Sequence, residues 1–395
     1  MSSSSVLSIN LLSRQFIESL KPKVTKVDSD QNLDLFCYTD CTTKDPAYVK
    51  ACRGLVFNQD ELVLKAFSFC PEYTIKDKDE FNLKHPDLSK YAIYDSYEGS
   101  IIRVFYAQDK WYVSTHRRLD AFKSRWGCAT SFGKFFSEAL EYEYSTSDVF
   151  KSRIEESEYA IEHPNESILD KFNNTLSKDK QYIFLLCNNE QNRIVCKPYS
   201  NPRVFHVGTL FGDELTMDIH VGLPSPSKYI SGLTLNDNDI FNYVENADPF
   251  EIQGLIFINI ESGEQFKLLN SQYKEYFDLR GNEPCIRTRY LQIRADLSKR
   301  TQFKLLYPSR EEEFLSYETV LYQVAQQILS AYIQRYIHKE YIVVAPDQYY
   351  IMKLCHAWHA EDREQHKISL NKVLAVINEQ NDKTQYRLIR TYKEL

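Results

Sequence analysis

One tight turn, at 94–99, carries side chains whose types could support chemistry. Ser96 offers a hydroxyl that becomes a useful nucleophile only when a nearby base takes its proton, and no base is evident beside it in the sequence. Arg53, well before the turn, and Lys267, well after it, supply positive charge. The residue types alone therefore do not indicate catalysis by Ser96.

Strands joined by turns must position these side chains. A strand enters the turn, the chain bends at Gly99, and strands over 101–107 and 111–115 continue as a β-meander. Apolar runs over 48–57 and 62–69 flank a polar turn, which predicts the hairpin that carries Arg53. Further strands are expected over 178–187, 193–197, 204–215, 251–260 and 264–269. The acidic stretch 145–170 is expected to be an irregular insertion.

The spacing of the apolar residues changes after Pro308. An apolar stripe at helical spacing follows, formed by Phe314, Tyr317, Leu321, Val324, Ile328, Tyr332 and Tyr336. This spacing predicts a long helix, and similar patterns at 349–360 and 370–380 predict two more. We therefore expect an α+β protein: an antiparallel-sheet domain over 1–297, with its core over about 30–275, and an all-helical domain over 298–395.

Composition limits the classes of function. The chain has 395 residues and a formal net charge of -7, so a bulk basic footprint for nucleic acid is missing, although its 48 Lys and Arg allow a local patch. Its nine cysteines are scattered without paired spacing, which favours reduced thiols inside a cell. We find no signal peptide in the sequence and no apolar run long enough to span a membrane. The expected location is intracellular, and a virion is a further option.

Several segments together resemble the RNA ligases of T-even phages and their relatives in large DNA viruses, which are covalent nucleotidyltransferases. The segments are CRGLVF at 52–57, the turn at 94–99, FLLC at 184–187 with NRIV at 192–195, IQGL at 252–255 and QFKLL at 265–269. Their order and spacing are similar to those of the family. The resemblance implies a ligase-like nucleotidyltransferase domain, with Arg53, Glu98, Gly99 and Lys267 in its nucleotide pocket.

The resemblance also implies that functional side chains of the family are replaced here. The lysine that attacks the α-phosphate of ATP becomes Ser96, the two carboxylates become Leu186 and Gln253, and a second phosphate-binding lysine becomes Leu269. Neither an aliphatic side chain nor an uncharged amide holds Mg²⁺ as a carboxylate does. We therefore expect no catalytic residue, no metal site and no cofactor, with ATP and Mg²⁺ bound only if residual ligase-like binding survives.

Two carboxylates lie close to the replaced ones along the chain. Glu190 follows Leu186, and Glu251 precedes Gln253, each at an even offset that keeps it on the same face of a strand. A strand rises roughly 3.3 Å per residue, so each carboxylate lies about 7 Å or more from the position that it would have to fill. Neither is expected to substitute unless the strand has slipped.

These observations favour a catalytically inactive, ligase-like protein that acts as an interaction or structural component. By family analogy, its partners are expected to be proteins, including capsid or other proteins of a large DNA virus particle or its assembly. One alternative is a nucleotide- or RNA-binding module without catalysis, although the net charge disfavours RNA. A second alternative is an active ATP-dependent RNA ligase with displaced groups; Lys90 and Lys110, the lysines nearest the turn, both lack the motif's context.

Other polar clusters have simpler interpretations. The basic segment 286–294 is expected to be a helix packed on the sheet domain, with a nucleic-acid or partner contact as the alternative. The basic residues at 116–118 suit a solvated turn as well as a binding role. Histidines at 356, 359 and 366 and a cysteine at 355 lack zinc-site spacing, so we expect no metal there.

Overall fold

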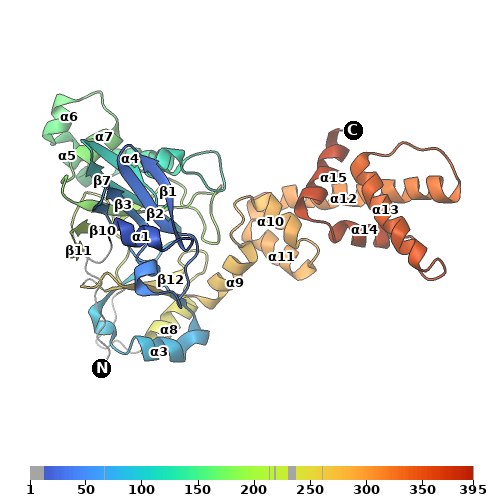
Figure 1. The fold of residues 1–395 in the computed structure, drawn as a ribbon, viewed down its shortest axis with the longest axis horizontal. Coiled ribbons are helices and arrows are strands. Elements are labelled where there is room, and N and C mark those ends of the chain that lie inside the picture. Colours follow the sequence, from blue (N-terminus) through green and yellow to red (C-terminus); the bar gives the residue numbers. More distant parts are fainter. Residues whose placement is uncertain are drawn as a thin grey trace. The chain divides into compact units, whose positions relative to one another are not determined.

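The computed structural model describes residues 13–65, 67–212, 214–217, 219–229, 237–259 and 261–394. The chain forms two compact units that divide between Phe277 and Asp278. The first unit is rich in strands and the second is helical, as Figure 1 shows. The expected fold class, α+β with antiparallel sheets followed by helices, is therefore confirmed.

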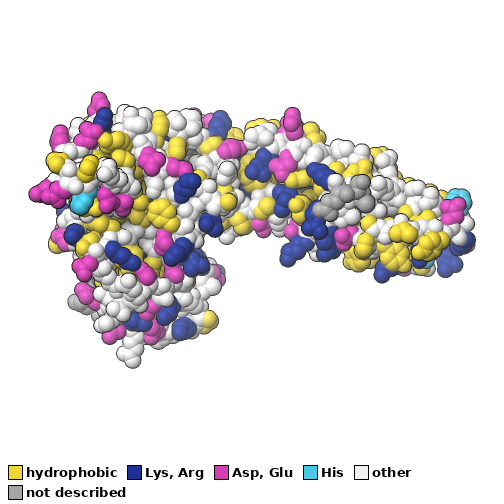
Figure 2. Space-filling view, turned by 90° about the horizontal axis from the view of Figure 1, so that it is seen from above, with side chains coloured by type: hydrophobic (Ala, Val, Ile, Leu, Met, Phe, Trp, Pro, Cys, Tyr) yellow, Lys and Arg dark blue, Asp and Glu magenta, His cyan; other side chains and the backbone are white. Residues whose placement is uncertain are grey.

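The two units differ in charge. Residues 1–277 hold 30 Lys and Arg against 40 Asp and Glu, a net charge of -10, whereas residues 278–395 hold 18 against 15, a net charge of +3. Figure 2 shows carboxylates spread over the strand-rich unit and basic side chains gathered over part of the helical unit. The overall acidity of the chain therefore belongs to the strand-rich unit alone.

The strands of the first unit form separate sheets. The amino-terminal sheet has the order β1-β2-β3-β4, with bounds Val24–Asp30, Leu33–Tyr38, Arg53–Asn58 and Glu61–Leu64. The central sheet has the order β11-β10-β9-β7-β8, with bounds Glu214–Thr216, Val204–Phe211, Gln181–Cys187, Gly99–Ala107 and Lys110–Ser114. The third sheet has the order β5-β13-β12-β6, with bounds Glu72–Tyr73, Gln265–Leu269, Gly254–Asn259 and Tyr91–Ser96. Within the third sheet, the short β5 pairs with β13 in parallel.

The turn at 94–99 joins two sheets instead of closing a hairpin. β6 pairs with β12, where Ser96 lies opposite Gly254, while β7 pairs with β9, where Gly99 lies opposite Cys187. The meander predicted for this region therefore begins only at β7. Because the chain crosses from the third sheet to the central sheet here, the side chains on either side of the crossing face different surroundings.

Helices α1 to α8 belong to the strand-rich unit, and α9 runs across the boundary between the two units. Their bounds are Arg14–Ser19 (α1), Ala47–Lys50 (α2), Lys78–Lys84 (α3), Phe132–Thr146 (α4), Asp148–Glu155 (α5), Glu158–Glu162 (α6), Ile168–Asn174 (α7), Asp237–Asn246 (α8) and Ser271–Arg280 (α9). The stretch 145–170, expected to be irregular, is helical because Ser147, Ser157 and Ser167 cap α5, α6 and α7 through their hydroxyls.

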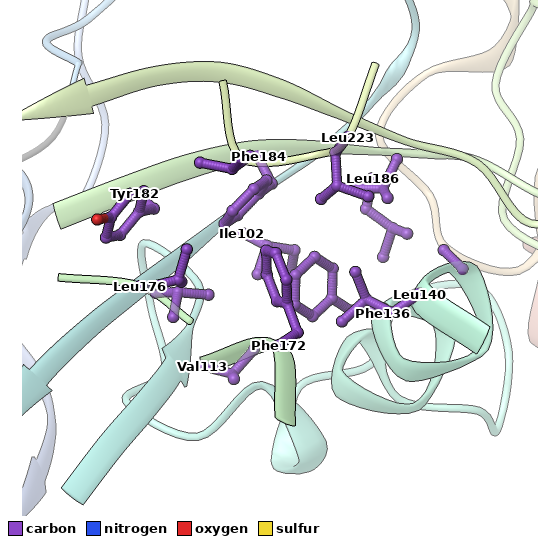
Figure 3. Close-up of a cluster of buried hydrophobic side chains, with 14 of the residues drawn as sticks. Ile102, Val113, Phe136, Leu140, Phe172, Leu176, Tyr182, Phe184, Leu186 and Leu223 are labelled. Carbon is purple, nitrogen blue, oxygen red and sulfur yellow. The ribbon is translucent and has the colours of Figure 1, made fainter. Parts of the chain in front are cut away.

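The main core lies between the central sheet and the helices α4, α5 and α7. Figure 3 shows Phe136 and Leu140 from α4 meeting Phe172 from α7 and Phe184 from β9, all of them fully buried. Leu186, also on β9, points into this cluster and is 3% exposed. This core holds β9 in place and thereby determines which of its side chains point away from the helices.

The second unit consists of α10 Ile286–Ile293, α11 Leu297–Leu306, α12 Glu311–Tyr332, α13 Pro346–Glu361, α14 Leu370–Asn378 and α15 Asp382–Glu394. Its boundary precedes the one expected at 297/298, because α10 packs within the helical unit. Arg294 Nε lies 2.7 Å from Glu318 Oε1 on α12, and Tyr290 donates to the same carboxylate. Among the helices of the described part, none has both the length and the apolar character that crossing a membrane requires.

Candidate functional site

A cavity of about 290 Å³ lies in the strand-rich unit, where β6, β12 and β13 face β3, β7 and β9. Five of the residues named by the sequence line it: Arg53, Ser96, Gly99, Gln253 and Lys267. Much of its remaining wall is apolar or aromatic, including Phe67, Phe69, Tyr94, Leu185, Val207, Met217, Ile256 and Ile258. The cavity therefore combines a polar end with an apolar body, as small-molecule sites do.

Ser96, Gln253 and Lys267 form one hydrogen-bonded group. The Ser96 hydroxyl donates to Gln253 Oε1 at 3.0 Å, and Lys267 Nζ donates to the same oxygen at 2.7 Å. The positions fit the strand register, since Ser96 lies opposite Gly254, and Gly254 lies opposite Leu269. An amide oxygen is not a base, so this arrangement holds the Ser96 proton in place and does not remove it.

The network continues behind the cavity wall. Gln253 Nε2 donates to the Tyr273 hydroxyl at 2.8 Å, and that hydroxyl donates to Glu98 Oε2 at 3.3 Å. Burial, with the Glu98 carboxylate close by, raises the pKa of Tyr273 well above its ordinary value. Tyr273 therefore stays a neutral donor, and every polar atom of the Gln253 amide group has a partner.

Glu98 was expected in the nucleotide pocket, but its carboxylate lies in a cradle of backbone groups outside the cavity. It accepts hydrogen bonds from the amides of Ile194, Val195 and Cys196 at 2.6, 2.8 and 3.1 Å. Asn188 Nδ2 adds a fourth at 3.0 Å. Because these amides bind a carboxylate, the stretch 193–197 does not form the strand that was expected there.

Close packing leaves no room for a side chain at Gly99 or at Gly54. A Cβ at Gly99 would lie 2.4 Å from the carbonyl oxygen of Leu186, so only glycine lets β7 approach β9 here. Gly54 has φ +85°, and a Cβ there would lie 2.7 Å from Arg103 Nη1 and 2.8 Å from His116 Cα. Both glycines therefore shape the cavity through the elements that they bring together.

Two of the positions that the resemblance assigned to lost functional groups do not face the cavity. Leu186 packs in the core behind β9, and its neighbour Leu185 lines the cavity instead. Leu269 is 2% exposed and does not line the cavity either. Neither leucine that was assigned to a lost functional group fills the pocket.

Arginines without carboxylate partners lie beside Arg53. Arg103 is fully buried, and it donates to the carbonyls of Gly54 and Thr115, while its Nε has no partner. Burial lowers the pKa of Arg103 to about 9. Burial, together with Arg53, Arg103 and Arg117, lowers the pKa of His116 to about 3, so this histidine is neutral at pH 7. Arg53 therefore extends into the cavity from a region of positive potential.

Other expected candidates lie elsewhere. Lys110 pairs with Asp30 at 2.8 Å and Lys90 with Asp87 at 3.7 Å, and neither lysine lines the cavity. Glu251 lines a separate cleft, discussed below. Sequence reasoning missed Glu72, next to Lys267 in the strand register, and Asp95, both of which line the cavity. No motif marks Glu72, and Asp95 was visible only as a member of the turn.

The basic and histidine-containing segments of the sequence are engaged in local contacts. Arg117 donates to the carbonyls of Tyr38 and Thr39, and Arg118 pairs with Asp28. In the helical unit, Arg287 lies over the Tyr386 ring, and the His356 ring stacks on Tyr336 at 4.0 Å. His359 Nδ1 and His366 Nδ1 each hydrogen-bond a backbone carbonyl. Across the described residues, no group of His, Cys, Asp or Glu is arranged to hold a metal ion.

Comparison with solved structures finds similarity to nucleotide-dependent ligases. A putative ATP-dependent DNA ligase from Aquifex aeolicus matches with a TM-score of 0.41 and 12% identity, over 75% of this chain and 72% of that one. An archaeal ATP-dependent RNA ligase matches with a TM-score of 0.40 and 10% identity, over 75% of this chain and 70% of that one. No family model matches the chain.

Comparison with curated sequences finds viral relatives. The chain is 30% identical over 320 residues to the immediate-early protein ICP-46 homolog of Invertebrate iridescent virus 6, which covers 78% of this chain and 67% of the relative. It is 24% identical over 281 residues to immediate-early protein ICP-46 of Frog virus 3, over 64% of this chain and 62% of the relative. The chain thus spans about two thirds of the length of these relatives. By this similarity, the chain belongs to the family of the immediate-early ICP-46 proteins.

Proposed function

We propose that this protein is a catalytically inactive, ligase-like protein that binds a nucleotide and acts through binding. The observation that carries the proposal is the group formed by Ser96, Gln253 and Lys267 at the end of an open cavity. Nucleotidyl transfer through an enzyme-bound intermediate needs a nucleophile that can lose its proton. Here the Ser96 hydroxyl donates a hydrogen bond to an amide oxygen, and Lys267 donates a hydrogen bond to the same atom.

The cavity itself supports binding. Its volume of about 290 Å³ lies near the lower end of the range for small-molecule sites, so it suits a nucleoside portion while a phosphate chain extends toward the polar end. Among the described residues, Arg53 and Lys267 are the cationic side chains that line it. Aromatic walls such as Tyr94 and Phe69 offer faces for a base. Of the cationic positions that the resemblance placed on the nucleotide, Arg53 and Lys267 are kept and the one at Leu269 is lost.

A second candidate is an active ligase with displaced groups, and one observation favours a specific form of it. Lys267 is the lysine that lines the cavity in the described part of the chain, whereas Lys90 and Lys110 do not. If a covalent adduct forms, we therefore expect it on Lys267. A role in a virus particle, and capsid or other protein partners, stay predictions. They would be tested by asking whether the protein sediments with purified particles.

Binding is tested by titrating ATP and AMP into the protein in a calorimeter. We expect saturable binding, weakened about tenfold or more by Arg53→Gln, because a charge-assisted contact to phosphate is lost. Arg118→Gln is the matched control, since Arg118 is exposed and does not line the cavity. Absence of binding to the folded wild type, or equal affinities for both variants, would contradict the proposal.

A further inference from the structure

A second, wider cleft lies in the strand-rich unit, on the other side of Asp95 and Tyr97 from the cavity. Its volume is about 830 Å³. It is bounded by the end of β6, by α8, by the segment 197–199 and by the loop that precedes β12. Asp95 and Tyr97 line both spaces, and they form the wall between them. The sequence analysis assigned no binding role to this cleft, although Asp95 and Tyr97 belong to the turn at 94–99.

Aromatic rings make up much of the cleft wall. They are Tyr97, Tyr199, Tyr229, Tyr243 and Phe250. Tyr229 and Tyr243 meet edge to face, with centroids 4.9 Å apart, and the Tyr243 hydroxyl donates to Asp95 Oδ1 at 2.8 Å. These two contacts position the Tyr243 ring against Tyr229 and Asp95. The face of an aromatic ring attracts a cation, and several rings around one space form the kind of site that binds ammonium and guanidinium groups.

The charges in the cleft favour the same kind of ligand. Carboxylates are supplied by Asp95, Asp239, Asp248 and Glu251. Among the side chains described there, the cation is Lys197, whose Nζ lies 5.6 Å from the centre of the Phe250 ring. The protein thus already places one of its own ammonium groups against this wall. The remaining carboxylates leave an excess of negative charge that a phosphate-bearing ligand would find repulsive.

We propose that this cleft binds a lysine or arginine side chain presented by a segment of a partner protein. The aromatic faces would hold the cationic head group and its alkyl stem, and Asp239 and Glu251 would supply the opposite charge. A metal ion is a poorer fit, because the carboxylates of the described residues do not converge as a ligand set. The cleft is wide enough to admit the flanking backbone of a peptide. The proposal is independent of nucleotide binding in the neighbouring cavity.

The test uses a short fluorescein-labelled peptide in which lysine alternates with glycine, followed by fluorescence anisotropy with the full chain at low salt. The comparison peptide carries norleucine in place of lysine, so that stem length is kept and charge is removed. We expect the lysine peptide to bind and the norleucine peptide to bind at least fivefold more weakly. Affinity should fall as salt is added, because these charges are near solvent.

Two variants locate the site. Asp239→Asn combined with Glu251→Gln removes two charges with little change in shape, and we expect about fivefold weaker binding. The matched control, Glu158→Gln with Glu162→Gln on α6, removes the same charge from residues that do not line the cleft, and should bind like the wild type. Tyr243→Ala should also weaken binding severalfold. Equal binding of both peptides, or of both double variants, would overturn the proposal.

Discussion

The cavity and the cleft share a wall but differ in character. The cavity is small and largely apolar, and its charged side chains are two cations, Arg53 and Lys267, and two carboxylates, Glu72 and Asp95. The cleft is wide and rich in tyrosine and carboxylate. Asp95 and Tyr97 belong to both. If both proposals hold, the end of one strand divides two binding sites, one for a phosphate-bearing ligand and one for a cationic side chain.

The difference arises from the elements that face the strand end. The cavity is closed by sheets on both sides, so strand pairing brings apolar residues into it, together with a buried polar group around Gln253. The cleft is closed by α8 and by loops, which carry exposed acidic side chains such as Asp239 and Glu251. In a paired strand, the register decides which side chains face a site. A loop can present its side chains in many directions.

The largest effect is expected at Glu98, which supports the strand end common to both sites. The Glu98 carboxylate accepts hydrogen bonds from three backbone amides. Glu98→Gln removes its charge and places a side-chain NH2 group close to those backbone N–H donors. We expect the free energy of unfolding to fall by about 3 to 5 kcal/mol, because hydrogen bonds to a buried charge are strong and their donors would be left unsatisfied. Urea denaturation monitored by circular dichroism measures this change.

A decrease in the free energy of unfolding below about 1 kcal/mol for Glu98→Gln would show that the hydrogen bonds to Glu98 contribute little to stability. The control is Glu162→Gln, an exposed residue of α6, which should leave the free energy of unfolding unchanged.

Leu185 and Leu186 give the next test, because adjacent residues of β9 face different surroundings. Leu186→Ala should lower the free energy of unfolding by about 3 kcal/mol, since it leaves a hole in the core cluster. Leu185→Ala should instead alter nucleotide affinity, since Leu185 lines the cavity. Denaturation and nucleotide titration of both variants separate the two roles. The reverse assignment, with Leu186→Ala affecting mainly affinity, would restore the position first inferred for the lost carboxylate.

Lys267→Met sharpens the contrast between the two sites. It removes an ammonium group that lines the cavity and does not line the cleft. We expect nucleotide affinity to fall about 10- to 100-fold, the usual value of a charge-assisted hydrogen bond, while lysine-peptide affinity stays the same. Lys90→Met is the matched control. A parallel loss of peptide binding would mean that the sites are not separate.

The smallest effect at neutral pH is expected behind the third sheet, away from both sites. His85 is buried and stacks on Phe266 at 3.7 Å, and its Nε2 has no hydrogen-bond partner. His85→Phe should raise the free energy of unfolding by about 1 kcal/mol, because a buried unsatisfied polar atom is removed. Neither ligand's affinity should change.

The same variant predicts a dependence on pH. Burial lowers the pKa of His85 to about 4, so the unfolded chain takes up a proton first as the pH falls below about 6.5. The wild type therefore loses stability between about pH 6.5 and pH 4, and the phenylalanine variant lacks this contribution. Near pH 5 the difference between the two should widen by a further 1 to 2 kcal/mol. A constant difference across this range would contradict the assignment.

The sequence anticipated part of this arrangement. The strands that carry Arg53, Ser96 and Lys267, and the strand that begins just after Gln253, were recognised from apolar runs and turns. The structure brings these four side chains to one cavity. The face on which Glu98 and Leu186 lie was not recognised, because a shift of one residue reverses the face of a side chain. The crossing between sheets at the turn, which sets that register, depends on pairings with strands far along the chain.

The cleft could not be read from the sequence for a related reason. Its walls come from β6, from the segment 197–199 and from α8, which are brought together only by the tertiary fold. Each contributing residue is an ordinary surface tyrosine or carboxylate when considered alone. Glu251 shows the point well: it was weighed as a displaced catalytic carboxylate, whereas the structure places it in the cleft.

The most direct test of the central claim is incubation of the full chain with α-labelled ATP and Mg²⁺, followed by a denaturing gel and intact mass measurement. A lysine-bearing ligase treated in parallel shows that the conditions support adduct formation. We predict that the folded protein binds ATP in the calorimeter and yet forms no covalent AMP adduct. An adduct would contradict the account, and its mapping to Lys267 would identify this chain as an active nucleotidyltransferase with a displaced nucleophile.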